Sequence, residues 1–93
     1  MEFEWDEEKN KINICKHRLD FIDAPEVFNG PMLIYLDTRK DYEEDRWVGI
    51  GTIKGRIVVI IFTERDKGET IRIISLRKAQ KHERKKFEEE IKN

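Results

Sequence analysis

The chain has 93 residues, of which 42% are charged and 38% are hydrophobic. This length predicts one domain over residues 1–93, with a thin core. The single cysteine, Cys15, excludes an internal disulfide, and no apolar run approaches the ~20 residues that span a bilayer. We therefore expect a cytoplasmic protein without a membrane segment, in which Cys15 is a small core residue.

Charge is distributed unevenly along the chain, although the net charge is only −1. Residues 1–45 carry 6 Lys or Arg and 13 Asp or Glu, a net −7, whereas residues 46–93 carry 13 against 7, a net +6. This pattern predicts one face for an anionic ligand. The alternative is that the two halves only neutralise each other in the folded protein.

Capping residues predict two short helices in the acidic first half. An extended segment over residues 3–5 leads into a helix that Asp6 caps and that runs to about His17. Asp20 caps a second helix, which ends near Phe28 before an Asn-Gly-Pro sequence. The first helix should pack through one narrow stripe, because it has few apolar positions. These positions are Trp5, Ile12 and Cys15.

The following residues have the two-residue period of strands. Four strands are predicted, over residues 32–37, 46–53, 56–65 and 69–75. Residues 57–62 are apolar on both faces, which indicates a central strand covered on both sides. Ser75 is expected to cap a last helix that runs to about Ile91. The predicted fold class is α+β, with two N-terminal helices, a four-stranded antiparallel meander sheet and a C-terminal helix.

The junction between the last strand and the last helix is strongly basic. Six of the ten residues from Arg77 to Lys86 are Lys or Arg. A helix that begins near Ser75 would present unpaired N–H groups and a positive dipole end, with Arg77 and Lys78 in its first turn. We expect this junction to bind phosphate, and a chain of phosphates indicates nucleic acid.

Charged residues are also expected at the ends of neighbouring strands. Arg72 lies in an otherwise apolar strand and therefore needs a ligand or a partner, for which Glu64 is one alternative. Glu64 is either a general base or a residue that holds an arginine. Arg65 either binds phosphate or is a solvated turn residue. Regular hairpin pairing would bring Arg46 to the same side of the sheet.

Histidine offers a further candidate for chemistry. His17 is either a favourable charge at a helix end or the proton carrier of a phosphoryl-transfer site. His82 is expected to be a solvated residue of the last helix. Two distant histidines and one cysteine have no metal-ligand spacing, so we predict neither a metal nor another cofactor. RNA needs no metal for cleavage, because its 2′-hydroxyl attacks the adjacent phosphate once a base, an acid and a cationic clamp are supplied.

The sequence resembles the BrnT toxins of bacterial type II toxin–antitoxin modules over nearly its whole length. The most specific match is residues 71–79, Ile-Arg-Ile-Ile-Ser-Leu-Arg-Lys-Ala. The other matching stretches are residues 3–6 with Lys9 and Asn10, Lys16-His17, residues 21–28, residues 46–51, residues 62–65 and Glu83-Arg84. Two positions depart from the family pattern, since Arg18 stands where glycine is usual and Leu76 where a small residue is common.

The resemblance implies a RelE-like fold and a metal-independent endoribonuclease that cleaves RNA and inhibits translation. A BrnA-type antitoxin would neutralise the toxin, and the antitoxin complex would hold a homodimer. The catalytic residues implied are His17, Glu64, Arg65 and Arg72. The RNA-binding residues implied are Arg46, Ser75, Arg77 and Lys78. In this reading Arg65 and Arg72 clamp the phosphate, while Glu64 or His17 moves protons. The alternative is a non-catalytic RNA- or protein-binding module on the same scaffold.

Overall fold

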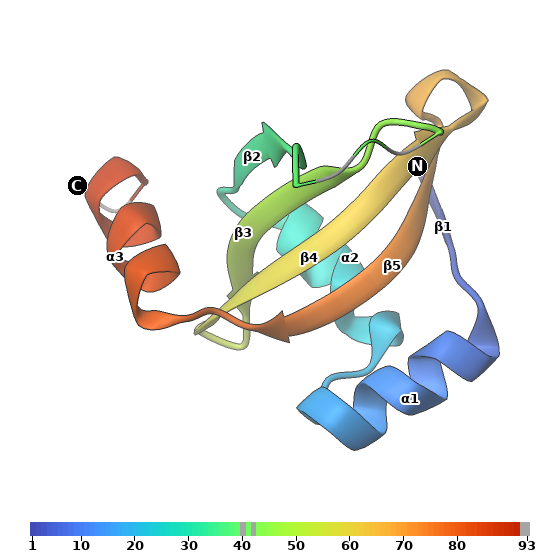
Figure 1. Cartoon of the computed structure of the whole chain (residues 1–93). Coiled ribbons are helices and arrows are strands. Elements are labelled where there is room, and N and C mark those ends of the chain that lie inside the picture. Colours follow the sequence, from blue (N-terminus) through green and yellow to red (C-terminus); the bar gives the residue numbers. More distant parts are fainter. Residues whose placement is uncertain (40, 42, 92–93) are drawn as a thin grey trace.

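In the described residues, 1–39, 41 and 43–91, the computed structural model contains a five-stranded mixed sheet with helices on both faces (Figure 1). The strand order is β1-β5-β4-β3-β2. The strands are β1 (Glu2–Glu4), β2 (Leu33–Leu36), β3 (Trp47–Ile53), β4 (Arg56–Arg65) and β5 (Thr70–Lys78). The α-helices are α1 (Glu7–His17), α2 (Ala24–Asn29) and α3 (Lys81–Glu90). The 3-10 helices are η1 (Phe21–Asp23) and η2 (Asp66–Gly68).

The predicted meander is confirmed for β2 to β5, each of which pairs antiparallel with the next strand. The prediction of a four-stranded, purely antiparallel sheet was wrong. Residues 2–4 form β1, which pairs parallel with β5 and places Glu4 beside Arg72. This pairing joins residues from opposite ends of the sequence, and three extended residues carry no local signal for it.

The last helix begins later than predicted. β5 continues to Lys78, which pairs with Val58 of β4, and Gln80 is the N-cap of α3. Ser75 is therefore not a helix cap, and the predicted helix N-terminus beside Arg77 was wrong. The physical reason is burial, because Leu76 is fully buried between β4 and the helices, and a helix from Ser75 would give up this strand pairing.

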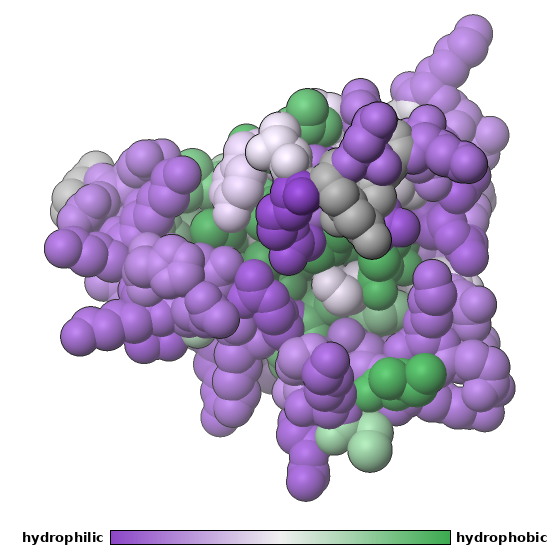
Figure 2. Space-filling view, in the orientation of Figure 1, coloured by the Kyte–Doolittle hydropathy of each residue, from purple (hydrophilic) through white to green (hydrophobic). Residues whose placement is uncertain are grey.

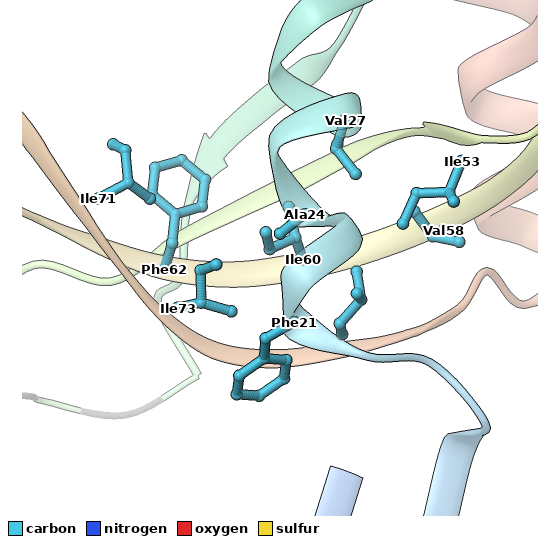
Figure 3. Packing of buried hydrophobic residues seen from close by; sticks show 10 residues of the cluster. Phe21, Ala24, Val27, Ile53, Val58, Ile60, Phe62, Ile71 and Ile73 are labelled. Carbon is cyan, nitrogen blue, oxygen red and sulfur yellow. The ribbon is translucent and has the colours of Figure 1, made fainter. Parts of the chain in front are cut away.

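The sheet separates two apolar clusters, as predicted for a central strand covered on both faces. On one face, Phe21 and Val27 of η1 and α2 pack against Ile60 and Phe62 of β4 (Figure 3). On the other face, Phe87 of α3 packs against residues of β3 and β4. The residues of β3 and β4 in this cluster are Val48, Ile50, Val59 and Ile61, and Ala79, between β5 and α3, belongs to it as well.

Hydrogen bonds, and not an apolar stripe, attach α1 to the sheet. Its buried residues are Asn10 and Asn13, whereas Ile12 is 64% exposed and Cys15 is exposed, so the predicted stripe was wrong at Ile12 and at Cys15. Trp5, which precedes the helix, packs against the core as predicted. The Asn13 amide donates to the Leu76 carbonyl at 2.9 Å, and its oxygen accepts from the Leu76 N–H at 3.2 Å. Asn13 thus pairs with β5 along the edge that β1 leaves uncovered.

Candidate active site

The face of the sheet opposite α2 is only partly covered, by α3. Figure 2 shows this face as largely hydrophilic, with a hollow near its centre where hydrophobic side chains come to the surface. A hollow of about 400 Å³ lies between β2, β5 and the start of α3. Its lining includes Val48 and Ile61 from the sheet, and Arg77 and Glu83 from β5 and α3.

The register of β5 brings three of the predicted residues to this face. Arg72 pairs with Thr63, Ser75 with Ile61 and Arg77 with Val59, and residues that are directly opposite share a face. Because Ile61 pairs with Ser75 while Phe62 pairs with Ile73, Ile74 is the extra residue of a β-bulge. The bulge lets Arg72 and Ser75 point to the same side although they are three residues apart.

Four of the predicted site residues lie together where α1 ends beside β5. His17 lines a hollow of about 390 Å³ with Arg77 and Lys78, and a neighbouring hollow of about 200 Å³ with Ser75. The larger of these two hollows is strongly basic. Its lining residues are Lys16, His17, Arg18, Arg77, Lys78 and Gln80. The structure thus brings His17, Ser75, Arg77 and Lys78 near one another, and their roles stay predictions.

The surroundings of His17 favour its neutral form. Partial burial is the largest cause that lowers the pKa of His17 below its ordinary value of 6.5, and the positive charges of Lys16 and Arg77 lower it further. The imidazole is therefore largely unprotonated at neutral pH. A neutral imidazole beside cationic groups is suited to accept a proton from a substrate that carries negative charge.

A bidentate ion pair fixes the Arg77 guanidinium. Its Nη1 and Nη2 atoms donate to the two carboxylate oxygens of Glu83 at 2.8 and 2.9 Å. The hydrogen bond from Arg77 is the main cause that lowers the pKa of Glu83. Glu83 also accepts from the N-cap N–H of Gln80 at 2.7 Å, so one carboxylate holds Arg77 and starts α3. Sequence analysis gave Glu83 no role, although it lies in a matching stretch.

Arg18 occupies a glycine-like backbone position at the end of α1. Its φ of 60° lies in the left-handed region, and its N–H closes the helix by donating to the Ile14 carbonyl at 2.8 Å. This geometry explains why glycine would suit the position. In this chain the position instead adds a guanidinium to the lining of the basic hollow. Neither Lys16 nor Arg18 was a predicted site residue.

A second group of arginines lies at the other end of the same face. Arg72 donates to Glu4 at 2.6 Å, and Arg65 lies 3.1 Å from Glu44 and 3.9 Å from Glu4. The partner of Arg72 is thus Glu4, and the alternative of a salt bridge with Glu64 was wrong. Glu4 comes from β1, the strand that the sequence did not predict.

The register separates Glu64 from these arginines. Glu64 pairs with Ile71, and Thr63 pairs with Arg72, so Glu64 and Arg72 face opposite sides of the sheet. Trp47 pairs with Phe62, which places Arg46, one residue earlier, beside Thr63 in the row of Arg72. Of the four residues expected on one side of the sheet, Arg46, Arg65 and Arg72 lie together on that side. Glu64 lies on the other side.

The predicted catalytic residues do not form one cluster. Arg72 and Arg77 lie opposite Thr63 and Val59, which are four residues apart on β4, so about 13 Å separates them at ~3.3 Å per residue. His17 lies at the Arg77 end, whereas Arg65 lies at the Arg72 end. One phosphate group is too small to reach both ends, whereas a polynucleotide is long enough to contact both.

Two other kinds of site have no counterpart in the described residues. No three or more His, Cys, Asp or Glu side chains among residues 1–39, 41 and 43–91 are grouped so that they could hold a metal ion. In the same part of the chain, no helix has the length and apolar character that are needed to cross a membrane.

Comparison with known proteins adds one match. A family model described as "Ribonuclease toxin, BrnT, of type II toxin-antitoxin system" matches residues 5–83. No curated protein matches the chain. The matched segment contains His17, Arg72 and Arg77, whereas Glu4 lies just outside it.

Proposed function

Because the chain belongs to the BrnT family of ribonuclease toxins of type II toxin–antitoxin systems, we propose that it is a metal-independent endoribonuclease that cleaves RNA and inhibits translation. It acts in the cytoplasm, and a BrnA-type antitoxin neutralises it. The toxin forms a homodimer through the antitoxin complex.

One observation carries the proposal, namely the convergence of His17 with Arg77 and Lys78 on one basic hollow. A phosphate in this hollow would have cations beside its oxygens and a neutral imidazole within the same lining. These groups are the base and the cationic clamp that metal-free RNA cleavage requires. They come from α1 and β5, which pack against each other.

The proposed reaction uses the nucleophile that RNA itself carries. His17 accepts the proton of a 2′-hydroxyl, and the 2′-oxygen forms a bond with the adjacent phosphorus atom. The bond between phosphorus and the 5′-oxygen breaks, and that oxygen takes up a proton from solvent water. The products are a 2′,3′-cyclic phosphate and a free 5′-hydroxyl. Arg77 and Lys78 stabilise the negative charge that builds on the phosphate oxygens.

The arginines at the other end of the face bind the neighbouring part of the RNA chain. Arg46, Arg65 and Arg72 share the side of the sheet that carries Ser75 and Arg77. We assign to them contacts with phosphates about 13 Å from those that Arg77 contacts, as follows from four strand residues at ~3.3 Å each. Glu64 faces the opposite side and has no role in this proposal.

Cleavage of a short RNA in the presence of EDTA tests the reaction. We expect cyclic-phosphate products from RNA and none from the all-deoxy oligomer, which lacks the attacking hydroxyl. His17→Ala should lower kcat/KM about 10²–10⁴-fold with little change in RNA binding, since a general base acts on the transition state. His82→Ala, on α3, is the matched control. Activity that EDTA abolishes, or cleavage of the deoxy oligomer, would contradict the proposal.

A non-catalytic RNA- or protein-binding module remains the second candidate. The observation in its favour is that Arg65, Arg72 and Arg77 each pair with a carboxylate, which partly neutralises the charge that catalysis would need at the phosphate. This candidate predicts RNA binding at low salt without any product, and unchanged translation in an extract that contains the protein. Light scattering of the antitoxin complex tests the homodimer, which requires two toxin chains per particle.

A further inference from the structure

The smaller hollow beside the proposed catalytic site has a mixed lining that phosphate binding does not explain. It measures about 200 Å³ and shares Lys16 and His17 with the basic hollow. Unlike the basic hollow, it also includes two isoleucines, Ile12 and Ile74. The remaining lining residues are Lys9, Asn13 and Ser75.

Ile12 lies on the surface of α1 and does not pack in the core. Its side chain is 64% exposed, and the buried positions of α1 are two asparagines. Lys9, Ile12 and Lys16 are spaced three and four residues apart, so they share one side of the helix with Asn13. The bonds of Asn13 to Leu76 hold this side of α1 against β5. The position of Ile12 beside the hollow is therefore fixed.

The bulge in β5 supplies the opposite wall. Ile74 is the extra residue of the bulge and is only partly buried, although it packs against the cluster under α3. Bulges redirect side chains and occur often beside active sites. Here the bulge places an aliphatic side chain and the Ser75 hydroxyl in the lining of the same hollow.

We propose that this hollow is a nucleobase-binding subsite for the nucleotide next to the cleaved phosphate. The inference rests on the proposed function and deepens it. A nucleotide joins an anionic phosphate to a flat ring with apolar faces and polar edges. The two hollows offer the same pair of environments side by side, joined at His17. Ile12 and Ile74 contact the faces of the base, while Lys9, Lys16 and Ser75 reach its polar edge.

The polar groups available predict which part of the base is recognised. Both Asn13 amide hydrogens are used by the Leu19 and Leu76 carbonyls, so Asn13 cannot donate to a ligand. Lys9 and Lys16 are donors only, and Ser75 both donates and accepts. The subsite therefore favours bases with carbonyl oxygens on the edge that enters it, namely uracil or guanine over adenine.

Two matched variants test the subsite. Ile12→Ser removes the apolar contact, and Ile22→Ser makes the same change at a side chain that is 66% exposed but lines neither hollow. The probes are a 2′-O-methyl oligouridine, which lacks the attacking hydroxyl, and an abasic 2′-O-methyl oligomer of equal length. Binding is measured by fluorescence anisotropy at low salt.

We expect wild type to bind the oligouridine more tightly than the abasic oligomer. Ile12→Ser should weaken oligouridine binding about fivefold, toward the lower end of base-stacking contributions, and should leave abasic binding within twofold. Ile22→Ser should match wild type with both probes. Ile12→Leu, which keeps an aliphatic side chain, should restore oligouridine binding.

Other outcomes overturn the inference in distinguishable ways. If wild type binds neither oligomer and does not cleave RNA, the proposed function fails together with the subsite. If RNA is bound and cleaved but Ile12→Ser changes the binding of both probes equally, or changes the binding of neither, only the subsite fails. If Ile12→Ser weakens antitoxin binding and leaves RNA binding unchanged, this surface is a protein-docking site.

Discussion

At the scale of single residues, the proposed chemistry depends on the protonation state of His17. Burial, Lys16 and Arg77 all lower its pKa below 6.5, so the unprotonated imidazole persists to lower pH than in an isolated histidine. If His17 is the general base, kcat/KM falls as the pH drops through this lowered pKa. The acid side of the pH profile should therefore have its midpoint below pH 6.5.

Lys16→Gln tests this dependence. Loss of a neighbouring positive charge makes the protonated imidazole less unfavourable, so the pKa of His17 should rise and the fall in kcat/KM should move to higher pH. An NMR titration measures the imidazole directly, and His82 gives a separate signal in the same spectrum. Lys11→Gln, on the same helix and ion-paired with Glu8, is the control. A midpoint that stays unchanged or moves to lower pH would refute this explanation.

At the scale of elements, α1 is held to β5 by polar contacts. An apolar substitution at this contact should therefore lower the stability of the protein. Asn13→Leu makes the helix more apolar but leaves the buried Leu76 N–H and carbonyl without partners. We expect a loss of about 2–4 kcal/mol in the free energy of unfolding, measured by urea denaturation. Lys11→Leu, at an exposed position of the same helix, should cost far less. Equal stability of the two variants would show that these hydrogen bonds contribute little.

Helix starts and hairpin turns could be predicted where a few neighbouring residues determine them. The side chain of Asp6 accepts from the Glu8 and Lys9 N–H groups, and that of Asp20 accepts from the Ile22 N–H, as their capping positions indicated. The turn at Lys54 and Gly55 has positive φ at both residues, as a tight hairpin requires. By contrast, the cap predicted at Ser75 failed because its capping preference was outweighed by pairing between β4 and β5.

The sequence named some residues of the candidate site, but it indicated neither Lys16, Arg18 and Glu83 nor the way in which the site is assembled. The sequence identified His17 and Arg77 separately, but the asparagine bonds that bring α1 beside β5 have no periodic signature. The partner of Arg72 was missed because Glu4 reaches it through β1, from the other end of the chain. The bulge at Ile74 shifts the alternation of β5, and such a shift is not readable from a run of apolar residues.

At the scale of the whole molecule, carboxylates compete with RNA for the proposed binding face. Glu4 lies within ion-pair distance of both Arg65 and Arg72, and the chain as a whole carries a net charge of −1. The face is therefore less attractive to a polyanion than its number of arginines suggests. Removal of one of these carboxylates should strengthen RNA binding.

Glu4→Gln tests this competition. Because surface ion pairs contribute modestly, we expect RNA to bind about two- to fivefold more tightly at low salt. The salt dependence should also become steeper if the released arginines contact phosphates. Glu2→Gln, on the same strand, removes an equal charge and is the control for net charge. Anisotropy titrations over a range of salt concentrations measure both effects, and weaker binding of Glu4→Gln would contradict the competition.

The position of β5 in the sequence also sets when the proposed site can form during synthesis of the chain. His17 and Arg77 are 60 residues apart, so the ribosome needs roughly 3–12 s to add the second after the first, at ~5–20 residues per second. Until then α1 has no strand to pair with, and the basic hollow lacks Arg77 and Lys78. Under the proposed function, a nascent chain would therefore not cleave the message from which it is being translated for most of its synthesis. Any product that terminates before Ile71 lacks nearly all of β5, and with it Arg72, Ser75, Arg77 and Lys78.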